Sequence, residues 1–345
     1  MLTETESAAF VADGFVEVEQ AFRARSPTRG GRCCGGRWAV TSMVCRLALC
    51  GRYSGRLSCE RAGRCPALDW KAEPLKVTVR NARFQQWEAL LANRNKRQRA
   101  GLFLIQGVRP ISLAAANGWR FESLLRPDGK QLSEWARGII AGSDADVIDV
   151  APELLAELGE RGSGEPELIA VGVTRPDDFD RIACGPDFFG IVFDRPVSPG
   201  NVGTLIRSAD AFGASAVVVS GHAADIYDPK AVRASTGSLF GLPVVRARST
   251  GEVASWVRDR QRAGIALRIV GTDEHGTADI ADYDLTGPLL IVIGNETTGL
   301  SAGWREVCDD IVRIPIGGGA SSLNAATAGS VLLYEAARQR RAAQR

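Results

Sequence analysis

The sequence predicts an α/β protein with a smaller N-terminal domain and a larger C-terminal domain built on a mostly parallel sheet. Composition is the first indication, because 45% hydrophobic and 24% charged residues in a chain of 345 suit a globular protein with a sizeable core. Second, apolar runs of strand length alternate with helical periods from about residue 75, and the alternation restarts near residue 186. Third, polar blocks stand directly after three apolar runs, as at the ligand-binding edge of an open parallel sheet.

Residues 1–74 are rich in Arg, Gly and Cys and show no sustained period, so we expect a low-order extension without a core. Two explanations stay open: a flexible basic arm that helps to hold nucleic acid, or a start codon assigned too far upstream. Six of the eight cysteines lie here without zinc-ligand spacing, so we expect neither a metal site nor a disulfide framework. They are Cys33, Cys34, Cys45, Cys50, Cys59 and Cys65.

The pattern divides the remaining chain into a domain over residues 75–170, a linker over residues 171–187 and a domain over residues 188–345. In the first domain we expect helices at residues 82–93, 110–117 and 132–140, and strands at residues 102–106, 121–125 and 146–150. In the second we expect strands at residues 188–193, 216–220, 244–246, 266–270, 289–293 and 311–316. Helices are expected at residues 202–212 and 251–262, after Asp228, and at residues 324–340. The last helix has an incomplete apolar stripe and should pack on the sheet or on a partner subunit.

Basic residues are concentrated between residues 76 and 109, where eight stand against one acid, Glu88, although the whole chain carries a formal charge of only +2. A run of this kind is typical of a surface that binds a polyanion. The alternative is a solvated helix face that binds nothing. We predict nucleic-acid contacts from Arg80, Arg83, Arg94, Lys96, Arg97, Arg99 and Arg109.

Several classes of protein are disfavoured. No apolar run reaches the roughly 20 residues needed to span a bilayer, and the N-terminus lacks the basic start of a signal peptide, so we expect a cytoplasmic protein. Neither a dinucleotide-binding glycine loop nor a P-loop occurs between a strand and a helix, which argues against hydride transfer and nucleotide hydrolysis. His222, His275, Cys184 and Cys308 lack partners at catalytic spacing.

The three polar blocks are residues 201–207 (NVGTLIR), 294–300 (GNETTGL) and 322–325 (SLNA). The carboxyl ends of parallel strands meet at one edge of a sheet, so we expect the blocks to share one pocket. The helix that starts near Asn201 has free N–H groups that can hold an anion, and Gly200 and Gly203 would permit its close approach. Arg207 can clamp a phosphate, or form an ordinary surface ion pair.

The second and third blocks each have a structural alternative. Glu296 follows a buried strand directly, so its carboxylate needs a partner. Asn295 can instead serve as a helix cap there. In the third block, Ser322 and Asn324 add side-chain hydrogen bonds to a glycine-rich loop, which is otherwise only a capped turn.

In order and spacing, the blocks resemble the three signature motifs of the SpoU/TrmH family of SPOUT methyltransferases, which use S-adenosylmethionine to methylate ribose 2′-oxygens in RNA. The first motif is matched by Asn201, Gly203, Arg207 and Ala209. The second is matched by Gly294, Asn295, Glu296, Gly299 and Leu300, and the third by Ile314, Pro315, Ser322, Leu323 and Asn324. Ile316 stands where the family has Met and Ala325 where it has Val, both apolar exchanges.

The resemblance covers residues 76–341 and implies a fold and an assembly. Residues 75–170 look like the family's RNA substrate-binding domain, which is similar to a small ribosomal protein. Residues 188–345 look like the knotted methyltransferase domain, in which the last helix passes through a loop to form a trefoil. The family also implies an obligate homodimer and no metal.

Site residues follow from the same resemblance. The family implies that S-adenosylmethionine contacts Thr272, Gly294, Asn295, Glu296, Ile314, Ser322, Leu323 and Asn324. It implies catalytic roles for Arg207, Asn201, Glu296, Ser322 and Asn324. Arg207 is implicated in activating the hydroxyl, but because a guanidinium stays protonated in proteins, we favour an electrostatic clamp over a base. Both readings stay open.

Residues 80–87, 221–225 and 271–276 further resemble a branch of the family, the avilamycin-resistance ribosomal RNA methyltransferases of actinomycetes. This favours 23S ribosomal RNA over tRNA as the substrate. Two alternatives stay open: a tRNA ribose 2′-O-methyltransferase, and a non-catalytic RNA-binding protein of the same fold. The sequence does not separate a resistance role from housekeeping modification.

Overall fold

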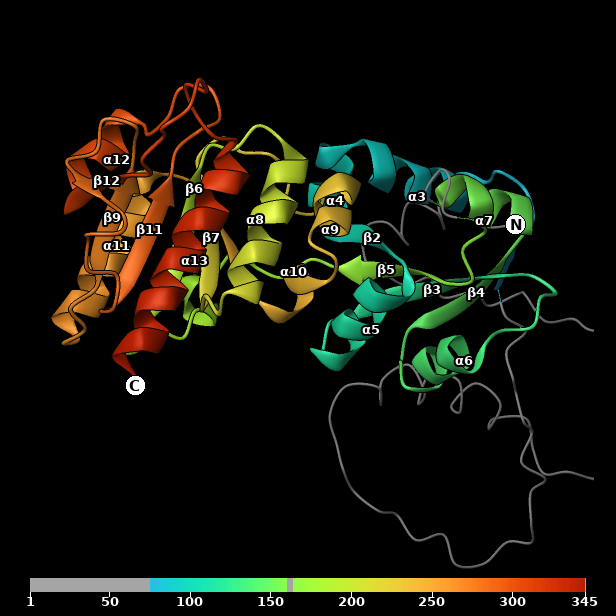
Figure 1. The fold of residues 1–345 in the computed structure, drawn as a ribbon. Coiled ribbons are helices and arrows are strands. Elements are labelled where there is room, and N and C mark those ends of the chain that lie inside the picture. Colours follow the sequence, from blue (N-terminus) through green and yellow to red (C-terminus); the bar gives the residue numbers. More distant parts are fainter. Residues whose placement is uncertain (1–74, 160–163, 345) are drawn as a thin grey trace, which may run out of the picture. The chain divides into compact units, whose positions relative to one another are not determined.

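The computed structural model of the chain describes residues 75–159 and 164–344, so the expectations for residues 1–74 lie outside the described residues. All the described elements belong to one compact unit. Two β-sheets with flanking helices build this unit (Figure 1).

The first sheet has five strands in the order β1-β4-β3-β5-β2. They are β1 (Leu75–Val77), β2 (Leu102–Gln106), β3 (Phe121–Pro127), β4 (Asp146–Val150) and β5 (Ile169–Val173). Strands β1, β4 and β3 are parallel, whereas β5 is antiparallel to both β3 and β2. The strands expected at residues 102–106 and 146–150 are confirmed to the residue, but β1 and β5 were not predicted. Because β5 reaches Val173, this sheet extends into the stretch expected to be the linker.

Five helices accompany this sheet: α3 (Ala82–Ala92), α4 (Arg94–Ala100), α5 (Val108–Ala116), α6 (Glu134–Ala141) and α7 (Pro152–Leu158). The helix expected over residues 82–93 ends where expected, because Asn93 leaves the helical conformation with φ −126° and ψ 110°. The Asn93 side chain then accepts a hydrogen bond from the Lys96 N–H and starts α4, which was not predicted. The basic run is therefore split over two helices.

The second sheet has seven strands, all parallel, in the order β10-β12-β9-β11-β6-β7-β8. They are β6 (Phe189–Asp194), β7 (Ala216–Ser220), β8 (Val244–Ala247), β9 (Arg268–Thr272), β10 (Ala278–Asp279), β11 (Leu289–Ile293) and β12 (Asp310–Arg313). Every residue of β6, β7 and β11 is buried, as in a parallel sheet covered on both faces. The expected mostly parallel sheet is confirmed.

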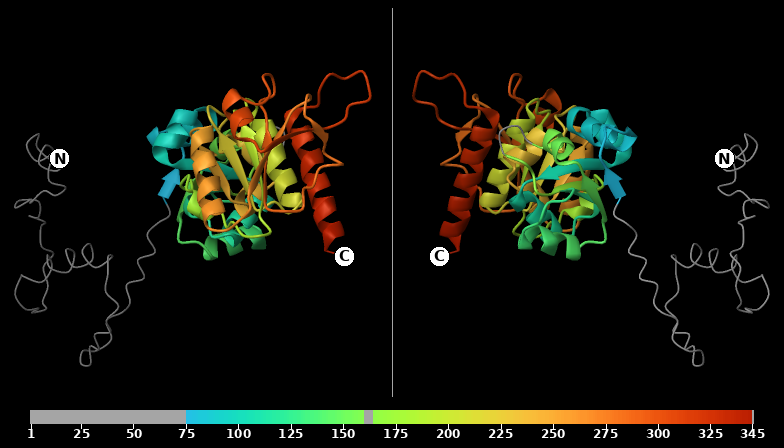
Figure 2. Two further views of the ribbon diagram at one scale, coloured as in Figure 1. Left: turned by 90° about the vertical axis from the view of Figure 1, so that its left-hand side faces the viewer. Right: turned by 90° about the vertical axis from the view of Figure 1, so that its right-hand side faces the viewer.

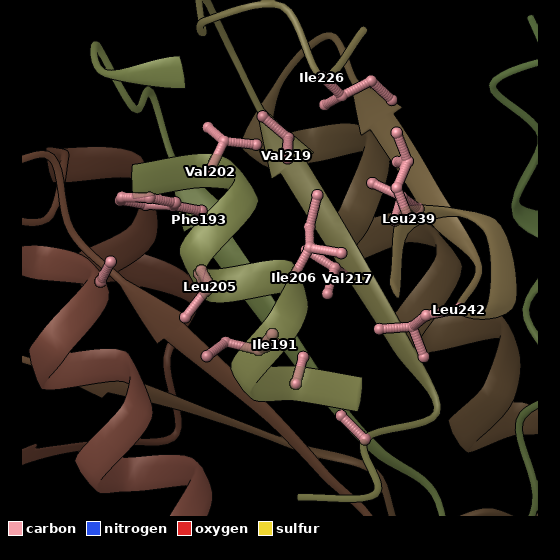
Figure 3. Packing of buried hydrophobic residues seen from close by; sticks show 14 of the residues in the cluster. Ile191, Phe193, Val202, Leu205, Ile206, Val217, Val219, Ile226, Leu239 and Leu242 are labelled. Atoms are coloured by element: carbon pink, nitrogen blue, oxygen red, sulfur yellow. The ribbon is translucent and has the colours of Figure 1, made fainter. Parts of the chain in front are cut away.

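Helices cover both faces of this sheet (Figure 2). On one face lie α8 (Pro199–Ala211), α9 (Pro229–Ala234), α10 (Ser238–Gly241) and α13 (Ala325–Ala343). On the other lie α11 (Thr250–Arg262) and α12 (Ala302–Val307), with the short 3-10 helix η1 (Phe179–Arg181) nearby. Figure 3 shows how α8 places Val202, Leu205 and Ile206 on the strand residues Ile191 and Val217.

The last helix packs on the sheet, one of the two arrangements expected for it. It lies against α8 and β11, and the backbones of α8 and α13 approach closely at Gly329. A Cβ atom at Gly329 would stand 2.4 Å from Leu205 Cδ1, so no larger residue fits without a shift. The Ser208 and Ser330 hydroxyls, 2.7 Å apart, add a hydrogen bond between the two helices.

An aromatic cluster joins the two sheets. The ring of Phe103 on β2 lies 4.6 Å from that of Tyr227 and 6.0 Å from that of Trp119, measured between centroids. The Trp119 indole N–H donates to the Phe240 carbonyl at 2.9 Å, which links the first sheet's domain to α10. Because all four rings are buried, the two sheets share one continuous core.

Within residues 75–159 and 164–344, no helix is long and apolar enough to cross a membrane. The same residues contain no group of three or more His, Cys, Asp or Glu side chains placed to hold a metal ion.

Candidate active site

A cavity of about 480 Å³ opens at the carboxyl edge of the parallel sheet. The segments after β9, β11 and β12 form its wall, and its volume falls within the range of about 300–1,000 Å³ that is usual for small-molecule sites. Seven of the eight residues expected to bind a cofactor line this cavity: Thr272, Gly294, Asn295, Glu296, Ile314, Ser322 and Leu323. The eighth, Asn324, does not line it.

The loop after β11 is held in a tight turn by its own backbone. Asn295 and Gly299 exchange two backbone hydrogen bonds of 3.0 and 3.1 Å. The Asn295 side chain accepts from the Thr297 N–H at 2.9 Å and donates to the Arg195 carbonyl at 2.6 Å. A Cβ atom at Gly294 would stand only 2.4 Å from the carbonyl carbon of Gly299, so the turn requires glycine there.

The Glu296 carboxylate lies at the N-terminus of α8. It accepts hydrogen bonds from the Val197 N–H at 2.9 Å, the Ser198 N–H at 3.1 Å and the Asn201 side-chain amide at 3.1 Å. Partial burial acts to raise the pKa of Glu296, but these hydrogen bonds outweigh it and lower the pKa below its ordinary value. The free N–H groups expected to hold an anion at this helix start therefore bind the protein's own Glu296 carboxylate. This carboxylate also holds the Asn201 side chain and makes no contact with Arg207.

Side-chain hydrogen bonds connect all three polar blocks. The Asn324 amide donates to Asn201 Oδ1 at 3.2 Å, and Asn201 in turn donates to Glu296. Asn324 also caps α13, because its Oδ1 accepts from the N–H groups of Ala326 and Thr327. Glu296, Asn201 and Asn324 thus form one chain of contacts beside the cavity, although Asn201 and Asn324 are 123 positions apart in the sequence.

Two expected site residues lie outside this network. Arg207 stands in the third turn of α8 and is exposed. Its side chain makes no hydrogen bond or ion pair with any residue that the structure describes. It does not line the cavity. Ser322 lines the cavity and is also exposed. The three-dimensional fold brings Ser322 to the cavity and leaves Arg207 on the neighbouring helix surface.

The expectation that Gly203 permits the approach of an anion is wrong. Gly203 is buried, and a Cβ atom there would stand 2.3 Å from the Ala231 carbonyl oxygen of α9. The glycine therefore lets α8 and α9 pack closely, and it faces protein instead of ligand.

Asp194 and Arg195, at the end of β6, were not predicted to support the site. Asp194 is only 2% exposed and accepts from the Ser220 hydroxyl, the Ser301 N–H and the Arg195 guanidinium. Arg195 has a left-handed backbone with φ 50° and donates to the Gly299 carbonyl at 3.3 Å. This pair ties the edge of β6 to the loop after β11. The signal in the sequence was a carboxylate closing an otherwise apolar strand.

Charged residues after β9 were also missed. Asp273, Glu274 and His275 line the cavity together with Arg305, and Asp273 pairs with Arg305. Their position directly after a buried strand was the available signal. With Glu296, the wall carries three carboxylates against one guanidinium, which suits a ligand that bears positive charge.

The two described cysteines are not activated. Burial raises the pKa of the Cys308 thiol to about 12, and burial raises the pKa of Cys184 as well. Neither lines the cavity. His222 does not line it either, whereas the ring of His275 is 86% exposed at its rim.

The basic residues between positions 80 and 109 differ in the contacts that they make. Lys96 and Arg99 are exposed, and their side chains make no ion pair within the described part of the chain. Arg80 pairs with Glu88 and Glu157, and Arg83 lies 4.0 Å from Glu122. Arg94 donates to the Ala223 carbonyl at 2.6 Å, and Arg109 to the Thr236 carbonyl at 3.2 Å.

Arg97 is a correction to the expected nucleic-acid contacts. It is 2% exposed, and its guanidinium bonds Asp225 at 2.7 Å and Asp228 at 3.2 Å, both from the segment that leads into α9. It also donates to the Leu90 carbonyl at 2.8 Å. A buried guanidinium with these partners cannot reach a phosphate, so Arg97 joins two parts of the protein instead.

Two family descriptions match the chain. Residues 81–170 match the SpoU L30e-like domain, and residues 189–334 match the SpoU rRNA Methylase family. The first match covers most of the five-stranded sheet, and the second covers the seven-stranded sheet with the start of α13.

Among curated proteins, the chain is 57% identical over 265 residues to the 23S rRNA (uridine(2479)-2′-O)-methyltransferase of Streptomyces viridochromogenes, covering 77% of this chain and 92% of that protein. It is 30% identical over 264 residues to the 23S rRNA (guanosine-2′-O-)-methyltransferase RlmB of Pseudomonas syringae pv. tomato, covering 74% and 93%. Both similarities extend over nearly the whole of the relative.

Among solved structures, the SpoU methyltransferase AviRb from Streptomyces viridochromogenes in complex with AdoMet is similar with a TM-score of 0.73 and 58% identity. The similarity covers 76% of this chain and 98% of that one. An AdoMet-bound rRNA methyltransferase from Sinorhizobium meliloti is similar with a TM-score of 0.67 and 28% identity, covering 76% and 97%.

Proposed function

The chain belongs to the SpoU rRNA Methylase family, and from that membership we propose that it is an S-adenosylmethionine-dependent methyltransferase of ribose 2′-oxygens in 23S ribosomal RNA. The observation that carries the proposal is the hydrogen-bonded chain of Glu296, Asn201 and Asn324 beside the cavity. The relative that is 57% identical bears the name of a 23S rRNA 2′-O-methyltransferase, which supports the same reaction and substrate.

The cavity fits S-adenosylmethionine chemically. Ile293, Ile314 and Leu323 provide apolar wall for an adenine ring, while backbone and hydroxyl groups provide hydrogen bonds. The excess of carboxylates over guanidinium groups suits a cofactor that carries a sulfonium and an ammonium group. When bound, S-adenosylmethionine supplies an electrophilic methyl group on sulfur.

The polar chain beside the cavity positions groups and does not remove a proton. Glu296 already accepts three hydrogen bonds that lower its pKa, so it is a poor general base. Its task is to hold the Asn201 amide, while Asn324 holds the other end of that amide. Fixed in this way, Asn201 and Asn324 orient a ribose hydroxyl for in-line attack together with Ser322 of the cavity wall, and positioning supplies much of the rate.

Arg207 acts in this proposal as an electrostatic clamp. Its guanidinium is exposed and free of protein partners among the described residues, so it is available to a phosphate of the substrate. A guanidinium next to the attacked ribose also stabilises the negative charge that develops on the 2′-oxygen.

Homodimer formation belongs to the same proposal. Tyr334 of α13 is 49% exposed, although its ring packs edge-on against Phe212 of α8 with centroids 5.8 Å apart. A second copy packed on the α8–α13 surface would cover this aromatic side chain and place the exposed Arg207 at an interface. Light scattering of the purified full chain measures this directly, and a monomeric mass at micromolar concentration would overturn the dimer.

The trefoil knot is proposed on similar grounds. From β10, at the edge of the sheet, the chain must return past β12 and β9 to reach β11. Helix α13 lies against this returning segment, because Gln339 accepts from the Leu285 N–H at 2.9 Å and Arg340 donates to the Leu285 carbonyl at 3.1 Å. Such contacts are required if the last helix passes through that loop.

The experiment that tests the function uses the purified full chain with S-adenosylmethionine and two RNA substrates, transcribed Streptomyces 23S rRNA and bulk tRNA. Methylated riboses are then mapped by their resistance to alkaline hydrolysis. We expect a resistant position in the 23S transcript and none in tRNA, as well as no transfer by an Asn201→Ala variant. Methylation of tRNA alone would overturn the substrate, and methylation that leaves the RNA alkali-sensitive would overturn the ribose as the target. We also propose a cytoplasmic location, because ribosomal RNA is the proposed substrate.

A further inference from the structure

Three exposed cations lie on the two sides of the junction between the sheets. Lys96 and Arg99 belong to α4 beside the first sheet, and Lys230 belongs to α9 beside the second. None of their side chains makes a hydrogen bond or ion pair with the described residues. Only Lys96 and Arg99 fall within the basic run of the sequence. Lys230 stands two residues after Asp228, which pairs with Arg97 of α4.

A buried latch holds α4 against the start of α9. Arg97 of α4 bonds Asp225 and Asp228, and Asp228 is the residue that caps α9. Arg94 adds a 2.6 Å hydrogen bond to the Ala223 carbonyl. Both α4 and α9 also pack against β2. These contacts hold α4 next to the start of α9.

The charges of the latch cancel, and those of the surface do not. Arg94 and Arg97 supply two positive charges against the two negative charges of Asp225 and Asp228. The three exposed cations, in contrast, have no ion-pair partner among the described residues. The placement of Lys96 and Lys230 is not explained by helix stability, because both stand in first turns that contain no acidic residue, where the helix dipole disfavours a cation.

We propose that Lys96, Arg99 and Lys230 form one ridge that binds RNA phosphates across the junction, while the Arg97 latch beneath it fixes the spacing of its two halves. This proposal rests on the proposed function. Helix α9 packs tightly on α8 at Gly203, and α8 carries Asn201 near its N-terminus. The ridge therefore runs from the L30e-like domain toward the catalytic blocks through rigid contacts, so RNA held on it keeps a constant distance from the cavity.

The test measures binding of the full chain to transcribed Streptomyces 23S rRNA at several salt concentrations. The variants are Lys230→Gln and the pair Lys96→Gln with Arg99→Gln, and then all three together. Matched controls are Arg137→Gln on α6 and Arg258→Gln on α11, both exposed and without ion pairs among the described residues. Each lost phosphate contact should reduce the slope of log affinity against log salt by about 0.7 to 0.9.

We expect the triple variant to lose on the order of 10-fold in RNA affinity at physiological salt, while the controls stay near wild type. Affinity for S-adenosylmethionine and turnover at saturating RNA should be unchanged in every variant. A Lys230→Gln protein with the affinity and salt slope of Arg258→Gln would overturn the ridge, even if wild type methylates the transcript normally. Wild-type protein that binds the RNA through the ridge but never methylates it would instead overturn the proposed function.

Discussion

The catalytic edge of the seven-stranded sheet and the basic surface of α4 use polar residues in opposite ways. At the edge, the side chains of Glu296, Asn201 and Asn324 each make two or more hydrogen bonds, and at least one of them joins a distant segment. On α4, Lys96 and Arg99 are exposed and free of ion pairs within the described residues. Attack by a hydroxyl requires fixed geometry, whereas attraction to phosphates depends mainly on charge. Substitutions should therefore act through geometry in the first region and through salt-sensitive binding in the second.

The largest effect of a substitution is expected at Arg97, which does not follow this contrast between the two regions. Although it belongs to α4, it is buried and paired like a residue of the catalytic edge. Arg97→Met should lower the free energy of unfolding by about 3–5 kcal/mol, because it leaves the Asp225 carboxylate buried without its cationic partner. Arg99→Met, two residues further on, should change it by less than about 0.5 kcal/mol. Urea denaturation measures both, and equal effects would contradict the buried latch.

Arg207 tests whether an exposed cation can belong to the catalytic region. Arg207→Ala should reduce turnover by about 100- to 1,000-fold, as expected when a group that stabilises developing charge is lost. Affinity for S-adenosylmethionine should be nearly unchanged, because Arg207 does not line the cavity. Steady-state methyl transfer and calorimetry give the two quantities, with Arg258→Ala as the exposed control. Turnover close to wild type would remove Arg207 from the reaction.

Gly294 tests how rigid the cavity wall must be. Gly294→Ala places a methyl group 2.4 Å from the carbonyl carbon of Gly299, so the turn has to open. Overpacking of this kind costs about 1–3 kcal/mol, which should appear as weaker binding of S-adenosylmethionine. Gly318→Ala is the matched control in the next loop, since nothing lies within 4 Å of its added Cβ atom. If both variants bind the cofactor like wild type, the tight turn is not needed for the site.

The smallest effect concerns pH and Glu296. Its folded-state pKa is lowered, because hydrogen bonds from Val197, Asn201 and Ser198 outweigh the effect of burial. The stabilisation is therefore present above the ordinary glutamate pKa and is lost as the pH falls through the lowered folded value. Melting temperatures of wild type and Glu296→Gln should differ at neutral pH and converge in acid. A constant difference over that range would show that the carboxylate charge contributes nothing.

Local pattern was sufficient for most of the large sheet. The strands expected at residues 216–220 and 289–293 are confirmed to the residue, because long apolar runs between turn residues specify a covered parallel strand. The second sheet's small edge strand β10 was missed, since it has two residues and is defined by its pairing with β12 alone. Strand β5 was missed although it is apolar, and the expected boundary between the first domain and the linker fell within it.

The candidate site shows the same division. Motif spacing selected Asn201, Glu296 and Asn324, and the fold joins them by hydrogen bonds. The same reasoning assigned Gly203 to a ligand, whereas it faces Ala231. A glycine's neighbour across a helix interface leaves no mark in the nearby sequence, so the pattern could not distinguish close packing from ligand approach.

The sequence by itself determined the fold class, the three polar blocks and the family to which the chain belongs. Buried strands and motifs can be recognised from residues that are close together in the sequence. Tertiary structure alone decided that Glu296 occupies the N-terminus of α8, that Arg97 is buried between Asp225 and Asp228, and that Asp228, two residues before Lys230, is bonded to α4. These facts depend on contacts between segments that are far apart in the chain. Whether a charge faces water, a carboxylate or a phosphate is set by what the fold places next to it.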